Sequence, residues 1–286
     1  MPVERRFHKP SLTLAAQVWG SPGERPVLAS HGWLDNAGTF DLLAPKLSGC
    51  ELVALDLAGH GFSDSRSADS AYNLWQDVGD LCDVADELGW QRCTLLGHSR
   101  GAAISMLFAA TFPERVDKLV LIEGGLPITA EADEAPEGLA QALREARALR
   151  GKAGRVFATR ATAIAERASG FSPVAPATAE VLARRSLREV EGGFQWHADQ
   201  RLKAQSELKL TPEQVRAFAR RVTAPVLLLF ASQSPFAGRP FYREMPKLFA
   251  NIEVGEMPGG HHCHLEGAEG PIAERIRAFL GLTTTN

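Results

Sequence analysis

The sequence predicts an α/β protein in which a mostly parallel β-sheet is covered by helices on both faces. Short β-type runs alternate with longer segments of helical periodicity, which is the pattern of such a sheet. The chain has 286 residues, 45% of them hydrophobic, so it can bury a large core. Between residues 126 and 222 the alternation stops. We therefore expect one domain that carries an insertion.

The strands are expected where short apolar runs end at glycine or another turn-forming residue. Seven runs satisfy this description: residues 12–19, 26–30, 52–57, 93–97, 118–122, 225–230 and 252–254.

The helices are expected between these runs. Residues 75–88 place apolar side chains at 75, 78, 81, 82, 85 and 88, on one helical face, and Gly89 supplies a stop. A second helix should start after Ser99, and residues 272–280 close the chain as an amphipathic helix. Residues 1–125 and 223–286 are thus the predicted core. Residues 126–222, rich in Ala, Arg and Glu and without a convincing strand, are predicted to form a helical cap.

Composition and charge exclude several classes of partner. The formal net charge is -3 with both signs interspersed, so no basic stripe suggests nucleic acid or an anionic membrane. No stretch approaches the roughly 20 apolar residues of a membrane helix. Residues 1–10 contain charges and no apolar run of signal-peptide length, and the four cysteines form no CxxC pair. We expect a cytoplasmic protein without a membrane span; the sequence does not indicate its oligomeric state.

A G-x-S-x-G motif at residues 97–101 provides the first catalytic signal. An apolar run precedes it and a helix-forming run, residues 102–110, follows it. A serine between strand and helix sits in a sharp, strained turn, where a Cβ at Gly97 or Gly101 would collide with neighbouring backbone. This turn exposes the hydroxyl of Ser99 at a helix N-terminus. Ser99 is therefore the predicted nucleophile.

Two backbone N–H groups are predicted to form an oxyanion hole. Residues 30–33 follow a predicted strand, at the place where such folds supply one oxyanion donor, and the residue after the nucleophile supplies the other. These donors would be the N–H groups of Trp33 and Arg100. The neighbouring His31, Gly32 and His98 are expected to contact the substrate.

The general base is expected in the histidine-rich segment 259–266, because a serine hydroxyl needs a base to become nucleophilic. His261 is favoured, since it follows two glycines that let the loop approach the serine. His262 and His264 are expected to be structural. Residues adjacent in sequence point in divergent directions and rarely complete a coordination sphere, so no metal is predicted here.

The triad acid is not in the usual place, the loop after residues 225–230, which contains no carboxylate. Glu123 is the predicted replacement, because it ends the strand beside the nucleophile strand and would be costly to bury unpaired. An alternative role for Glu123 is a salt bridge or an anchor for the cap. Asp199 and Glu256 are more remote candidates for the acid.

The motifs together resemble the α/β-hydrolase superfamily, and more narrowly the serine hydrolase-like proteins, over nearly the whole chain. The stretches that carry the resemblance are HGWLDNA at 31–37 with 40–41, GHGFS at 59–63, LGHS at 96–99, residues 112–119, and DQRL at 199–202. The resemblance implies an eight-stranded α/β-hydrolase fold and a hydrolase with a helical cap. Arg100 and the loop after Phe230 depart from the pattern of these relatives.

The function expected from these residues is hydrolysis of a carboxylic ester or a related acyl bond in a small molecule, without a cofactor. Ser99 would form an acyl-enzyme, with His261 as base and Glu123 as acid. Perhydrolysis and C–C bond hydrolysis use the same triad and stay open as alternatives. A third alternative is a non-catalytic ligand-binding protein on this fold. Asp199 and Arg201 are expected either to pair inside the cap or to line its pocket.

Overall fold

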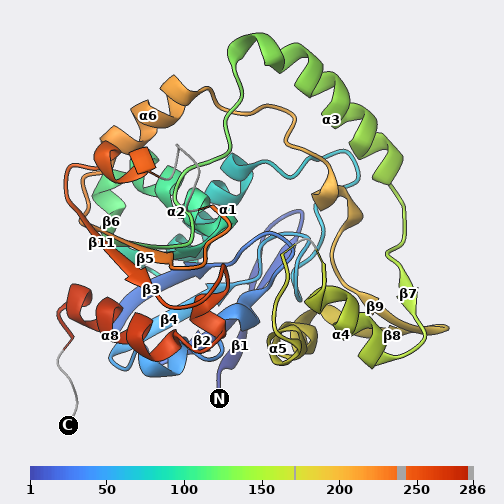
Figure 1. The fold of residues 1–286 in the computed structure, drawn as a ribbon, viewed down its shortest axis with the longest axis horizontal. Coiled ribbons are helices and arrows are strands. Elements are labelled where there is room, and N and C mark those ends of the chain that lie inside the picture. Colours follow the sequence, from blue (N-terminus) through green and yellow to red (C-terminus); the bar gives the residue numbers. More distant parts are fainter. Residues whose placement is uncertain (171, 237–242, 283–286) are drawn as a thin grey trace.

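The computed structural model describes residues 1–170, 172–236 and 243–282. An eight-stranded sheet runs through the molecule in the order β1-β2-β4-β3-β5-β6-β10-β11 (Figure 1). Strand β2 pairs antiparallel with β1 and with β4, and the other neighbours pair in parallel. The predicted α/β fold with a mostly parallel eight-stranded sheet is confirmed.

The strands of this sheet agree with the predicted runs to within a few residues. They are β1 (Val3–His8), β2 (Thr13–Trp19), β3 (Arg25–Ser30), β4 (Cys50–Leu55), β5 (Cys93–His98), β6 (Val116–Ile122), β10 (Val226–Ala231) and β11 (Ile252–Met257). Only β1 lacks a predicted counterpart. It is an edge strand with three charged or polar side chains exposed, and Phe7 is its one buried residue, so its sequence carries little apolar signal.

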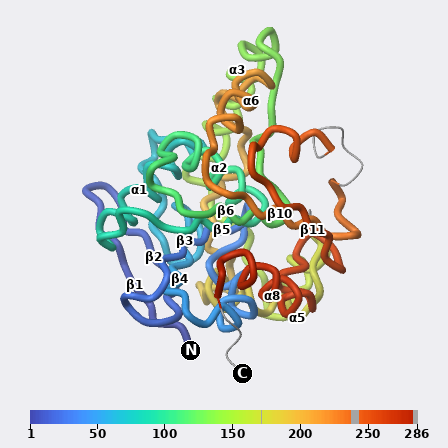
Figure 2. The backbone as a smooth tube through the Cα atoms, turned by 90° about the vertical axis from the view of Figure 1, so that its left-hand side faces the viewer, coloured from blue at the N-terminus to red at the C-terminus, as the bar shows by residue number. Residues whose placement is uncertain are grey.

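Helices cover both faces of the sheet (Figures 1 and 2). One face packs against α1 (Leu74–Glu87), α2 (Arg100–Thr111) and α6 (Pro212–Arg221), and the other against α8 (Glu269–Leu280). Side chains alternate between the faces, so that Leu228 joins the first core and Leu227 the second. Within the described part of the chain, no helix is long and apolar enough to cross a membrane.

The first of these helices shows how local sequence sets the element boundaries. At the start of α1, the Gln76 side chain accepts a hydrogen bond from the backbone N–H of Asn73 at 2.9 Å, which satisfies a donor that the helix leaves free. At its end, Gly89 adopts φ +73°, a left-handed conformation that glycine adopts without steric cost. The predicted helix 75–88 is therefore shifted by one residue.

The segment between β6 and β10 contains α3 (Ala135–Leu149), α4 (Arg160–Ala168), α5 (Pro176–Ser186) and finally α6, which packs on the core sheet. Contrary to the prediction, it is not purely helical, because a three-stranded antiparallel sheet lies within it. Its strands are β7 (Val156–Phe157), β9 (Gly193–Trp196) and β8 (Leu187–Val190). They are two to four residues long, too short to show an alternating pattern.

Two ion pairs join this segment to the loops that follow β3 and β4. Arg185 of α5 contacts Asp56 at 2.6 Å, and Arg167 of α4 contacts Asp35 at 2.8 Å. Both carboxylates are almost completely buried, so each needs a partner that compensates for its lost hydration. Asp35 and Asp56 therefore hold the inserted segment in place.

Candidate active site

Ser99 lies in the turn between β5 and α2, as the motif predicts. Its backbone has φ 53° and ψ -114°, a conformation that costs a non-glycine residue energy. A Cβ on Gly101 would lie 2.1 Å from the carbonyl oxygen of Ser30, and one on Gly97 would lie 2.5 Å from the backbone nitrogen of Ala102. Only glycine fits at either position, which explains why the strained turn carries this motif.

Three of the predicted site residues form a chain of hydrogen bonds. His261 Nε2 is 3.0 Å from Ser99 Oγ, and His261 Nδ1 is 3.1 Å from Glu123 Oε2. The residues come from three loops at the carboxyl ends of β5, β6 and β11. The serine is thus within hydrogen-bonding reach of a base that is itself oriented by a carboxylate, which is the geometry of a nucleophile and its activating pair.

Glu123 is held by the strand on its other side. Its side chain is completely buried, its backbone has φ 51°, and its Oε1 accepts a 2.7 Å hydrogen bond from the backbone N–H of Ala231. Ala231 ends β10, and the loop after it is the one that lacks the carboxylate expected there. This loop therefore supplies a backbone donor to Glu123 in place of a carboxylate. No sequence signal pointed to Ala231, because any residue provides an N–H.

The two more remote carboxylates do not approach His261 through any described contact. Asp199 accepts hydrogen bonds from Tyr72 and pairs with Arg201 at 2.6 Å, and Glu256 is exposed on the edge strand β11. Asp199 and Arg201 also line a cavity of about 440 Å³. The pairing that the sequence left open is therefore present. The lining of this cavity includes none of Ser99, Glu123 and His261, so contact of Asp199 and Arg201 with a substrate pocket stays a prediction.

The residues predicted to supply oxyanion donors have side chains engaged elsewhere. Trp33 Nε1 donates to the carbonyl oxygen of Leu202 at 2.8 Å, which ties the loop after β3 to the inserted segment. The Arg100 guanidinium pairs with Asp77 of α1 at 2.6 Å. This ion pair accounts for an arginine beside the nucleophile. It also leaves the backbone N–H, which the prediction requires, independent of the side chain.

His31 and His98 are completely buried, so their side chains serve the framework of the site. His31 Nδ1 donates to the Gly32 carbonyl at 2.7 Å and its Nε2 accepts from the Leu57 N–H at 3.0 Å. His98 Nε2 donates to the carbonyl of His261 at 2.9 Å. The contacts with substrate predicted for His31, Gly32 and His98 remain predictions.

The other two histidines of the loop have separate partners. His262 Nε2 lies 3.0 Å from Asp35 Oδ2, and His264 Nε2 lies 2.7 Å from Thr39 Oγ1. Both side chains are buried. The loop therefore directs His261 to Ser99 and its neighbours to the framework, as the sequence predicts.

Burial keeps four histidines neutral, and we expect the protein to lose stability in mild acid. Burial lowers the pKa of His31, His60 and His98, and lowers that of His264 to about 3. Below pH 6.5 these histidines become protonated in the unfolded chain but stay neutral in the folded protein. The free energy of unfolding therefore falls as pH falls. Each histidine contributes up to about 1.4 kcal/mol per pH unit.

Denaturant unfolding at pH 7.0, 6.0 and 5.5 measures this effect. We expect the free energy of unfolding to fall by roughly 5 kcal/mol across the range, as the upper limit for four such groups. Replacing His60 by glutamine should reduce the slope by about one quarter. An unfolding free energy that is constant over the range would show that these histidines bind protons in the folded protein as they do in the unfolded chain.

Comparisons with known proteins identify the family of this chain. A family model described as the alpha/beta hydrolase fold matches residues 25–268. The chain is 31% identical to the serine hydrolase-like protein of Danio rerio, over 97% of this chain and 88% of the relative. It is 33% identical to serine hydrolase-like protein 2 of Homo sapiens, over 94% of this chain and 91% of the relative.

A solved structure is also similar along nearly the full length. The crystal structure of a hypothetical protein from Pseudomonas aeruginosa PAO1 has 43% sequence identity and a TM-score of 0.93, covering 97% of this chain and 99% of that chain. The sequence motifs, the eight-stranded sheet and these relatives lead to the same assignment. This chain belongs to the α/β-hydrolase fold family and, within it, to the serine hydrolase-like group.

Proposed function

We propose that this protein is a serine hydrolase that cleaves a carboxylic ester or a related acyl bond through an acyl-enzyme on Ser99. The observation that carries the proposal is the pair of hydrogen bonds joining Ser99 Oγ to His261 Nε2 and His261 Nδ1 to Glu123 Oε2, at 3.0 and 3.1 Å. These bonds give each residue a distinct role in nucleophilic catalysis.

In this mechanism His261 removes the proton of Ser99 as the hydroxyl oxygen attacks the acyl carbonyl. The resulting imidazolium is stabilised by ionised Glu123, which also fixes the ring with its proton on Nδ1. His261 then protonates the leaving alcohol, and the ester bond breaks. Water deprotonated by His261 attacks the acyl-enzyme in the second half of the reaction and releases the acid.

The oxyanion is held, in this proposal, by the backbone N–H groups of Trp33 and Arg100. Loss of one such donor lowers the kcat of an enzyme by about 10²- to 10³-fold, so these two groups should contribute a large share of the rate acceleration. The start of α2 adds its dipole, with positive character directed at Ser99. No cofactor takes part in these steps.

The inserted segment, residues 126–222 without its last helix α6, acts in this proposal as the cap that selects the substrate. Arg167 and Arg185 attach it to buried carboxylates of the core, and Trp33 binds it through Leu202. A segment attached at several points can define the shape of a substrate pocket. We propose short to medium acyl esters as the substrates.

Hydrolysis of p-nitrophenyl esters from acetate to decanoate tests this function. The wild-type protein should turn over one part of the series and thereby report its preferred acyl length, whereas Ser99→Ala should reduce turnover to background. Turnover that survives in Ser99→Ala would remove Ser99 from the mechanism. A wild-type protein that hydrolyses none of these esters and resists labelling by a fluorophosphonate would favour the non-catalytic ligand-binding alternative.

A further inference from the structure

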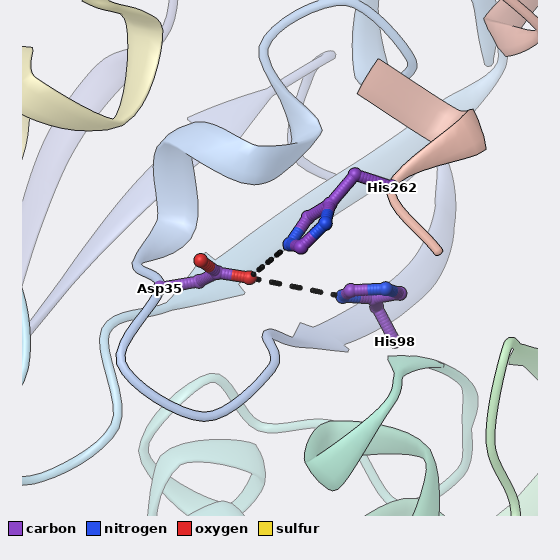
Figure 3. Close-up of side chains that lie close together, drawn as sticks. All are labelled: Asp35, His98 and His262. Carbon is purple, nitrogen blue, oxygen red and sulfur yellow. Dashed lines mark hydrogen bonds and ion pairs between the residues drawn. The ribbon is translucent and has the colours of Figure 1, made fainter. Parts of the chain in front are cut away.

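Three buried side chains next to the candidate triad converge on one small region (Figure 3). Asp35 comes from the loop after β3, His98 from the end of β5 and His262 from the loop after β11. Their relative exposures are 2%, 0% and 2%. Each offers one nitrogen or oxygen atom, and these three atoms all lie within 4.8 Å of one another. Ordinary packing does not require three polar groups to meet in this way.

The protonation state of His98 can be derived from its contacts. Its Nε2 lies 2.9 Å from a carbonyl oxygen, that of His261, so Nε2 must carry the proton. In a neutral imidazole the other ring nitrogen then carries no proton. Its Nδ1 is therefore a bare lone pair, and no described atom makes a hydrogen bond to it.

This lone pair faces another acceptor. Nδ1 of His98 lies 4.0 Å from Oδ2 of Asp35, as one dashed line in Figure 3 marks. The other carboxylate oxygen of Asp35, Oδ1, pairs with Arg167 at 2.8 Å, so Oδ2 is the oxygen that faces His98. Two acceptors that face each other in a buried region are stabilised by a positive centre between them.

We propose that Asp35, His98 and His262 form a binding site for Zn²⁺ or a divalent transition metal of similar ligand preference. Imidazole nitrogens and a carboxylate oxygen are ligands of this class, whereas Mg²⁺ and Ca²⁺ prefer sites made of oxygen alone. The site takes one histidine of the segment 261–264 and adds two residues remote in sequence. It therefore avoids the divergence of adjacent side chains that argued against a metal cluster within that segment.

The distances leave the ligand atoms close to the spacing that zinc needs. Tetrahedral Zn²⁺ with bonds near 2.0–2.1 Å places its ligand atoms about 3.4 Å apart. The carboxylate oxygen Oδ2 of Asp35 lies 3.0 Å from His262 Nε2 and 4.0 Å from His98 Nδ1. Gly32 contributes room, because a Cβ there would come within 3.1 Å of both Asp35 Oδ2 and His98 Nδ1. Side-chain shifts of about 1 Å would complete the geometry.

The groups behind the ligand atoms also suit a metal. The second oxygen of Asp35 accepts from Arg167 at 2.8 Å, and the second nitrogen of His98 donates to a carbonyl. Such outer hydrogen bonds orient ligands and are a regular part of metal sites. Coordination uses the Nε2 lone pair of His262, so the ring proton of the bound form resides on Nδ1.

The consequence for activity rests on the proposed function. The rings of His98 and His262 lie with centroids 4.8 and 5.2 Å from that of His261. A divalent cation there, only partly neutralised by Asp35, would disfavour the imidazolium that His261 must form when Ser99 is acylated. We therefore expect bound zinc to inhibit acylation.

Calorimetric titration of the tag-free protein with ZnCl₂ tests the site directly. One Zn²⁺ per chain should bind to the wild-type protein, and Mg²⁺ should not bind. Asp35→Asn and His262→Gln should each weaken zinc binding by at least about 10-fold, the lower end of the effect of altering a metal's surroundings. His8→Gln, which changes an exposed histidine outside the cluster, should bind as the wild type does.

Two further measurements distinguish a failure of the metal site from a misfolded variant and from a failure of the proposed function. Thermal unfolding without metal shows whether each variant is folded, and His262→Gln provides the test if Asp35→Asn does not fold. Ser99→Ala should bind zinc as the wild type does, because Ser99 is not a ligand. Stoichiometric zinc binding by a wild-type protein that hydrolyses no ester would contradict the proposed function and leave the metal site standing. Unchanged zinc affinity in a folded Asp35→Asn or His262→Gln, or no zinc binding by the wild type, would overturn the metal site.

Discussion

Replacing Glu123 by glutamine should lower the acylation rate of Ser99 by about 10³- to 10⁴-fold, the size of effect seen when a triad carboxylate becomes an amide. Glutamine has nearly the same shape, and its carbonyl oxygen can still accept from Ala231. Its NH₂ group would then face Nδ1 of His261 and require a lone pair there. The ring proton would move to Nε2, where it prevents His261 from accepting the proton of Ser99.

The second-order rate of p-nitrophenyl ester hydrolysis, measured beside the thermal unfolding temperature, reports this effect. Glu256→Gln is the matched control, because it makes the same chemical change at an exposed site on β11. It should leave both quantities unchanged. A Glu123→Gln protein that is folded and retains at least a tenth of the wild-type rate would show that Glu123 has a structural role and that another group orients His261.

Ser99→Ala and His261→Ala should each lower kcat by roughly 10⁴- to 10⁶-fold, and the double variant should lower it no further. The two side chains act as one unit, because the base has no purpose without the hydroxyl and the hydroxyl is a weak nucleophile without its base. Burst and steady-state kinetics on the preferred p-nitrophenyl ester measure all three variants. Additive losses would contradict a shared mechanism.

His264→Gln serves as the control within the same loop. Its partner is the hydroxyl of Thr39, to which a glutamine amide can also bond, and we expect a small loss of stability with kcat within about tenfold of wild type. If His264→Gln abolished turnover while His261→Ala preserved it, the base would have been assigned to the wrong histidine.

The sequence predicted the positions of the triad candidates well because each depends on local structure. The turn around Ser99 needs two glycines, whose absent side chains leave room for the backbone of Ser30 and Ala102. Glu123 was singled out as a charge at the end of an apolar strand. The order of the strands, β5-β6-β10-β11, then brings the ends of β5, β6 and β11 to one region of the sheet edge, and this placement follows from the fold class.

Other features could not be predicted because they depend on contacts between distant residues. The edge strand β1 and the three short strands of the inserted segment are defined by their pairing partners. Their sequences carry too little periodicity to identify them. The hydrogen bond from Ala231 to Glu123 has a backbone N–H as its donor, so the identity of residue 231 gives no sign of it.

The cluster of Asp35, His98 and His262 illustrates the same limit. In the sequence Asp35 is one of several polar turn residues, His98 belongs to the nucleophile motif and His262 is the neighbour of the predicted base. Only the fold brings them within 4.8 Å. The structure also shows that His98 Nε2 is bonded to a carbonyl oxygen, which leaves Nδ1 as the nitrogen without a hydrogen-bond partner.

The covalent intermediate on Ser99 is the most direct test of the account. The protein is mixed with its preferred p-nitrophenyl ester, quenched in acid within the burst phase and examined by intact mass spectrometry, followed by peptide mapping. We predict a mass increase of one acyl group, located on the peptide that contains Ser99 and absent from Ser99→Ala. Steady turnover with no acyl adduct at any quench time, or an adduct on another residue, would contradict it.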